Sequence, residues 1–138
     1  MNYLLKSDPY EWLLSEEKCQ GIFNDEILPI NELTFTTVMS WMKNLDSADF
    51  ELEYYEDDCE VCPTKARGKK RLVPYLEGHF YVFTKLGNVV TTSIEPSFEM
   101  GSYDALILKG EVDQSYIMSV IVCPDCGSFQ LSLEQVDM

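Results

Sequence analysis

Residues 120–129, VIVCPDCGSF, decide the predicted fold, because two cysteines, a proline and a glycine interrupt two runs of strand-forming residues. An ordinary hairpin turn only reverses the chain, whereas the turn at 123–126 also brings two sulfur atoms close together. Pro124 stiffens this turn, and Gly127 accepts the positive φ with which the chain leaves it. The stretch therefore predicts a β-hairpin whose turn binds a metal ion.

A second CxxC turn lies about 60 residues earlier, at residues 59–62. Two such turns that meet would supply four thiolates, which form the closed tetrahedral shell that suits structural Zn²⁺; iron would fit the same four sulfurs. The gap exceeds the ~15–20 residues of many compact four-cysteine sites, so a β-insertion must bring the turns together. The predicted metal ligands are Cys59, Cys62, Cys123 and Cys126.

The second turn, CPDCG, resembles the metal knuckle of zinc ribbons and rubredoxin-like proteins over about ten residues of a hairpin. The first turn departs from this pattern, since Pro63 follows Cys62 where the knuckle has glycine, and no proline follows Cys59. The chain must therefore leave the first turn with a different geometry.

Length and charge restrict the class of protein. The 138 residues fit a single domain, and the 46% hydrophobic content is typical of a packed globular protein. A formal charge of −14 disfavours nucleic acid and anionic membranes and favours a cationic partner, although acidity also serves solubility. The chain has no leader-like N-terminus and no apolar run approaching the ~20 residues of a membrane span, so a cytoplasmic location is expected. In such a reducing compartment, cysteines indicate metal binding or thiol chemistry.

Hydrophobic periodicity predicts an α+β fold, with N-terminal helices packed on a mostly antiparallel β-sheet that carries a zinc-ribbon-like four-cysteine clamp. Residues 1–48 are predicted to be mainly a helical cover, and residues 49–138 mainly β. The expected helices cover residues 7–21, with Ser7 or Asp8 as N-cap and Pro9 at the first position, and residues 34–45. The expected strands start with a half-buried one at 49–58 and continue with a hairpin at 79–94 that turns at Gly87-Asn88, and with 103–110, 115–122 and 128–136.

Two charged segments flank the first cysteine turn. Residues 49–60 contain seven acidic residues and no base, and residues 65–71 (KARGKKR) contain five of the ten basic residues. The basic segment balances the charge of a Zn²⁺–thiolate centre and of the acidic strand; alternatively, it binds phosphate or nucleic acid. The acidic segment is either a solvated strand edge that opposes aggregation or a recognition surface for a basic protein or a second cation.

Enzymatic activity is not predicted. His79 is the only histidine, no nucleophile motif accompanies it, and we interpret it as a partly buried structural residue. Cys19 is interpreted as a core thiol at a helix end. Four cysteines would close the zinc shell and leave no coordination position for a substrate.

The chain as a whole resembles a family of small bacterial proteins of unknown function, through the motifs GIFNDE, EYYEDDC, HFYVFTK, VDQSYIMSVIVCPDCG and the final LEQ. The resemblance covers nearly the full chain and implies no activity. Together these observations predict a non-enzymatic protein-binding or regulatory module with structural zinc. The alternatives are a nucleic-acid-associated zinc ribbon that uses residues 65–71, and a thiol redox protein with a reactive CxxC turn. Sequence leaves the oligomeric state open.

Overall fold

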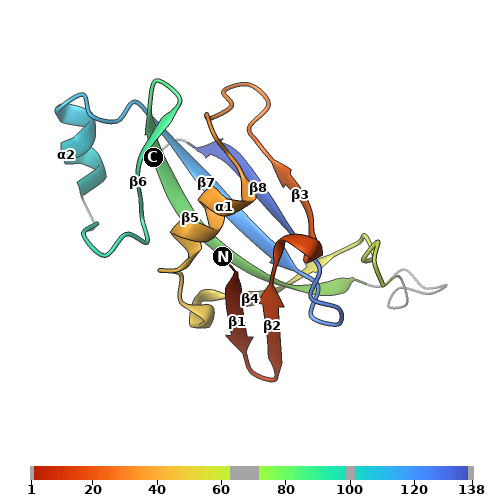
Figure 1. Cartoon of the computed structure of the whole chain (residues 1–138). Helices are drawn as coiled ribbons and strands as arrows, with labels where there is room; N and C mark the ends of the chain where they lie inside the picture. The colour runs from red at the N-terminus through yellow and green to blue at the C-terminus, as the bar shows by residue number, and fades with distance from the viewer. Residues whose placement is uncertain (1, 63–71, 99–101, 137–138) are drawn as a thin grey trace.

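The computed structural model describes residues 2–62, 72–98 and 102–136, in which eight strands and two α-helices occur (Figure 1). The strands are β1 (Tyr3–Ser7), β2 (Tyr10–Leu14), β3 (Cys19–Phe23), β4 (Glu51–Tyr55), β5 (Val73–Lys85), β6 (Asn88–Thr92), β7 (Gln114–Val122) and β8 (Phe129–Val136). The α-helices are α1 (Phe35–Met42) and α2 (Ser102–Leu108), and short 3-10 turns cover Glu16–Lys18 and Ser47–Asp49.

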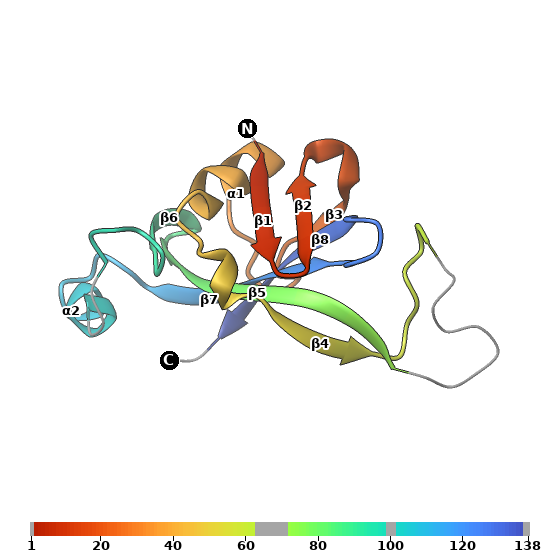
Figure 2. The same cartoon turned by 90° about the horizontal axis from the view of Figure 1, so that it is seen from below.

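A six-stranded sheet forms the body of the protein, in the order β3-β8-β7-β5-β4, and β6 also pairs with β5. All these strand pairs are antiparallel except β3 with β8. The long strand β5 pairs with β7 from Leu76 to Thr84. Figure 2 shows β5 curving along its length, so that the sheet is curled.

The hydrophobic core covers one face of this sheet. Every second residue of β7 from Tyr116 to Val122 is buried there, which is the period of a strand with one covered face. The β1–β2 hairpin and α1 both lie over this face (Figure 2). Burial of each large apolar side chain contributes about 1.5–3 kcal/mol, so this layer is the main source of stability.

Helix α1 lies within the range predicted for it, residues 34–45. The side chain of Thr34 caps its N-terminus by accepting a hydrogen bond from the Thr37 amide. Val38, Met39 and Met42 are buried against the sheet, as their helical spacing predicts.

The helix predicted at residues 7–21 is wrong. Strands β1 and β2 form an antiparallel hairpin there, with Ser7 opposite Tyr10 and a cis Asp8–Pro9 bond in the turn. In β1, the buried Tyr3 and Leu5 alternate with exposed residues. The Ser-Asp-Pro signal is shared by helix starts and tight turns, and here it marks a turn.

The predicted α+β class is therefore also wrong. The described residues are mostly β, and residues 2–48 contain three strands and one α-helix rather than a helical cover. The strand expected at 103–110 is instead helical, as α2. Gly110, at φ +70°, ends α2 because its amide bonds to Ile107 and the Glu111 amide bonds to the Leu106 carbonyl, a Schellman arrangement.

The remaining predicted strands all form. The hairpin predicted at 79–94 is β5 and β6, but its turn is at Leu86-Gly87 instead of Gly87-Asn88, because Asn88 already pairs with Lys85, and β5 begins earlier, at Val73. β7 and β8 flank the second cysteine turn, as predicted. β4 also forms, but it is not half-buried as predicted, because Leu52 and Tyr54 are 42% and 57% exposed.

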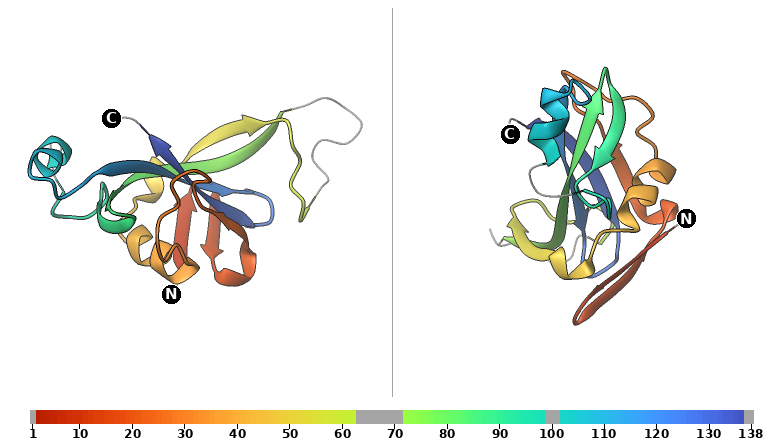
Figure 3. Two further views of the ribbon diagram at one scale, coloured as in Figure 1. Left: turned by 90° about the horizontal axis from the view of Figure 1, so that it is seen from above. Right: turned by 90° about the vertical axis from the view of Figure 1, so that its left-hand side faces the viewer.

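Helix α2 lies at the end of the molecule opposite the cysteine turns (Figure 3). Within the described ranges, neither α-helix has the length and apolar character that crossing a lipid bilayer requires. The cysteine turns, at the other end of the sheet, are the part of the described fold where we look for a site.

Candidate metal centre

The fold brings the two cysteine turns together at one end of the sheet. Cys59 Sγ lies 3.8 Å from Cys126 Sγ, and Cys62 Sγ lies 3.5 Å from Cys123 Sγ. All four sulfur atoms lie within 4.8 Å of one another, and none is in a disulfide. The cluster could therefore hold a metal ion.

The spacing of the sulfurs matches a tetrahedral shell. With Zn–S bonds of about 2.3 Å, the edges of an S₄ tetrahedron are about 3.8 Å long. The Cys62–Cys123 and Cys59–Cys126 sulfur separations of 3.5 and 3.8 Å are close to this edge length, whereas a disulfide would require about 2.05 Å. The donor set and its size thus fit Zn²⁺ or iron, and the described geometry does not choose between them.

The second turn is built into the β7–β8 hairpin. The Cys123 amide donates to the Ser128 carbonyl at 2.8 Å, and the Gly127 amide donates to the Cys123 carbonyl at 2.8 Å. Gly127 has φ +75°, which glycine adopts without strain. The backbone of this hairpin therefore fixes the positions of Cys123 and Cys126.

The N-terminal hairpin covers the second turn. Trp12 Nε1 donates to the Pro124 carbonyl at 2.8 Å, and the Trp12 ring packs so closely on Gly127 that an added Cβ would overlap it. Lys18 Nζ donates to the Cys126 carbonyl at 3.0 Å and lies 5.1 Å from the Trp12 ring centroid. The sequence analysis did not find either contact, because each joins residues more than 100 positions apart in the chain.

The first turn follows β4 and lies against the sulfurs of the second. Asp58 Oδ1 accepts a hydrogen bond from the Cys59 amide at 2.9 Å. The Tyr75 hydroxyl of β5 donates to the Asp57 carbonyl at 3.0 Å. Cys59 is buried, as is Cys123, so each turn contributes one inner sulfur.

The environment of Cys59 favours its thiolate form. Burial raises its pKa, but hydrogen bonds from the Ser128 hydroxyl and from the amides of Cys62 and Val61 outweigh this effect and lower the pKa to about 6. Ser128 Oγ lies 3.4 Å from Cys59 Sγ and 3.0 Å from Cys126 Sγ. Burial and the neighbouring thiols raise the pKa of Cys62, because a second negative charge without a cation is unfavourable. A bound cation removes that penalty.

The other residues considered from the sequence lie elsewhere. His79 is 42% exposed on the open sheet face, where its Nε2 lies 2.7 Å from Glu77 Oε2 and its Nδ1 lies 3.0 Å from Ser119 Oγ. Tyr55 donates to the other oxygen of Glu77. Cys19 packs beside the core, and burial raises its pKa, as expected for an inert thiol.

The two charged segments are covered unequally. The whole acidic segment 49–60 is described, and its strand β4 is exposed along its whole length. The basic segment 65–71 lies outside the described residues.

A mostly β fold with a curled sheet and four clustered cysteines at one end defines the class of this protein. The chain belongs to a family of proteins of unknown function, DUF3785, whose model matches residues 3–138, so the predicted family resemblance is confirmed. No match was found among curated proteins or solved structures.

Proposed function

We propose that this protein is a non-enzymatic protein-binding module whose sheet is fastened by a structural Zn²⁺ ion held by Cys59, Cys62, Cys123 and Cys126. The observation that carries this proposal is that four sulfurs from two distant turns lie within 4.8 Å of one another. Four thiolates close the shell, which is the usual arrangement of structural rather than catalytic zinc.

The ion would act as a crosslink. It would join turns that are about 60 residues apart, for which the loop-entropy estimate is about 4 kcal/mol. This is a large share of the 5–15 kcal/mol typical of whole domains. The first turn is not flanked directly by paired strands, as the second turn is, so the position of its sulfurs would depend on the ion more than that of the second turn.

A structural role is also favoured by the surroundings of the only histidine. His79 and Ser119 face each other directly across the β5–β7 ladder. A serine nucleophile needs backbone N–H groups that are free to stabilise an oxyanion. The N–H groups of central strands form hydrogen bonds within the sheet, so they are poor candidates for this role beside Ser119. The Ser119, His79 and Glu77 contacts are better explained as cross-strand pairs that stabilise the sheet.

The charge of the protein favours a basic partner. The formal charge is −14, and the acidic segment 49–60 leads directly into the first cysteine turn. Four thiolates around Zn²⁺ would add a net charge of about −2 at the same end. A positively charged protein surface is therefore the partner that this region would attract.

Metal analysis of the purified protein tests the proposal. Wild type should contain about one zinc per chain, and Cys123→Ser should lose most of it because three thiolates no longer close the shell. Cys19→Ser is the matched control, since Cys19 lies outside the cluster, and it should retain the metal. Equal metal content in wild type and Cys123→Ser would contradict a site at these cysteines. If wild type contains about one iron per chain and no zinc, the structural metal of the proposal is iron.

A further inference from the structure

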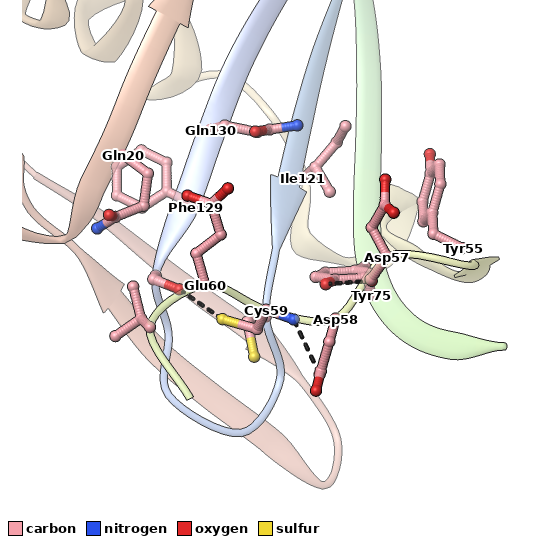
Figure 4. Close-up of a pocket in the computed structure, with 13 residues that line it drawn as sticks. Gln20, Tyr55, Asp57, Asp58, Cys59, Glu60, Tyr75, Ile121, Phe129 and Gln130 are labelled. Atoms are coloured by element: carbon pink, nitrogen blue, oxygen red, sulfur yellow. Dashed lines mark hydrogen bonds between the residues drawn. The ribbon is translucent and has the colours of Figure 1, made fainter. Parts of the chain in front are cut away.

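A cavity of about 240 Å³ lies between the first cysteine turn and the end of the sheet. Figure 4 shows its lining side chains, which come from β3, β4, β5, β7, β8, the loop between β7 and β8, and the segment that carries Cys59. Drug-sized ligands occupy pockets of about 300–1,000 Å³, so this cavity is better matched to a single amino-acid side chain.

The lining combines apolar and aromatic surface with negative charge. Ile121 and Phe129 contribute apolar surface, and Tyr55 and Tyr75 form an aromatic pair whose ring centroids are 5.6 Å apart. The methylene stem of lysine or arginine packs well on such a surface, and its charged head is attracted to the faces of aromatic rings.

The charged groups of the lining have one sign. Asp57, Asp58 and Glu60 all line the cavity, and among the described residues no basic side chain lines it. Asp58 already accepts a hydrogen bond from the Cys59 amide, which leaves Asp57 and Glu60 as the carboxylates to assign to a ligand. Phosphates and nucleotides are therefore disfavoured, and a small hydrated metal ion would not use the apolar part of the lining.

We propose that this cavity binds the guanidinium or ammonium side chain of a basic protein partner, with its stem against Ile121 and Phe129 and its charge beside Asp57 and Glu60. This inference rests on the proposed function, because the metal holds the first turn, and so one wall of the cavity, in place. Arginine suits the site best, since its planar head stacks on tyrosine rings and pairs with two carboxylate oxygens.

An NMR titration of the zinc-loaded full chain tests this assignment. The probe is N-acetyl-arginine methylamide, and the control ligand is the citrulline analogue, which has nearly the same shape without the charge. Arginine should shift the amide signals around Tyr55, Glu60 and Ile121, and citrulline should bind about tenfold more weakly. Equal binding of the two ligands, or shifts only outside the cavity, would overturn the assignment.

Charge variants separate the cavity from the net charge of the protein. Asp57→Asn combined with Glu60→Gln should weaken arginine binding by about tenfold. The matched control combines Glu26→Gln with Glu111→Gln, which removes the same charge from exposed residues outside the cavity lining. Equal weakening by both pairs would show a diffuse charge effect and would overturn the proposal.

Two further readouts keep the possible failures distinct. Zinc content is measured on every sample. Loss of arginine binding in a variant that is folded and contains zinc concerns the cavity alone. Absence of zinc from the wild-type protein contradicts the proposed function instead. Neutralising the basic residues of 65–71 tests whether the chain itself supplies the cation. A clear increase in arginine affinity in that variant would overturn the assignment to a partner protein.

Discussion

The two cysteine turns contribute the same chemistry but are supported differently. The second turn closes a hairpin of two long paired strands and is covered by Trp12 and Lys18. The first turn follows the short, exposed edge strand β4, and its sulfurs contact mainly the sulfurs and Ser128 of the second turn. The backbone of the β7–β8 hairpin therefore fixes the second turn, whereas the first turn has less support from the sheet and, under the proposed function, would depend more on the ion.

Metal removal should have the largest effect and should affect the two turns unequally. Chelation is expected to lower the free energy of unfolding by about 4 kcal/mol, the loop-entropy estimate for a closure of about 60 residues. For a chain of this size, that corresponds to a fall in melting temperature of roughly 10 °C or more. Calorimetry measures the total effect, and hydrogen exchange resolves the two turns.

In the metal-free protein, exchange should accelerate strongly in residues 56–62 and much less in the hairpin around Cys123. Equal acceleration of both turns would show that the hairpin does not form the second turn without the ion. An unchanged melting temperature would contradict the crosslink itself.

The Gly127→Ala variant should break the second turn, with the next largest effect. A left-handed backbone costs alanine about 1–2 kcal/mol, and the overlap of its Cβ with the Trp12 ring brings the expected loss to about 3 kcal/mol. Gly110→Ala is the matched control, because Gly110 also has a positive φ, of +70°, but its Cβ would meet no atom within 4 Å. Chemical denaturation measures both losses, and equal losses would exclude a contribution from Trp12.

The Ser128→Ala variant should weaken the site by an intermediate amount. The Ser128 hydroxyl lies within hydrogen-bonding distance of one sulfur from each turn, Cys59 and Cys126. Its loss should reduce zinc affinity about tenfold, a typical effect of residues that support metal ligands. Chelator competition measures this change, and Ser132→Ala on β8, the strand that begins just after Ser128, should leave the affinity unchanged.

The same variant also predicts a pH effect. The Ser128 hydrogen bond helps to lower the pKa of Cys59 to about 6, so its removal raises that pKa. Protons then compete better with the metal, and the pH at which half the zinc is released should move upward. A midpoint that stays constant or moves downward would contradict the role assigned to Ser128.

Replacement of Trp12 by phenylalanine should have the smallest effect of the series. The ring stays apolar, but its hydrogen bond to the Pro124 carbonyl is lost, which costs about 1 kcal/mol. Tyr10→Phe on the same strand is the control. Thermal unfolding measures the stability, and hydrogen exchange should show the change around the second turn while residues 56–62 remain as in wild type.

Parts of the fold could be predicted because their signals are local. The apolar spacing of Val38, Met39 and Met42 identifies α1, and alternation or β-branched runs identify β5 to β8. The N-terminal hairpin could not be predicted in this way, since Leu4 and Leu13 face each other on its exposed side. Apolar residues on both faces hide the period of two that identifies a strand.

Helix α2 shows a different ambiguity. Its consecutive apolar residues 105–108 fit either a strand or a helix, and Leu108 is 87% exposed in the structure. Gly110 is the signal that favours the helix, because a glycine shortly after such a run often ends a helix.

The sequence by itself determined the chemistry of the candidate site, because each CxxC turn is encoded in about five neighbouring residues and prescribes its own geometry. Only the tertiary structure decided that the two turns meet, that Trp12 and Lys18 lie on the second, and that a negatively charged cavity opens beside the first. These features depend on strand pairings and packing between residues far apart in the chain, and no short stretch of sequence contains the energies that select them.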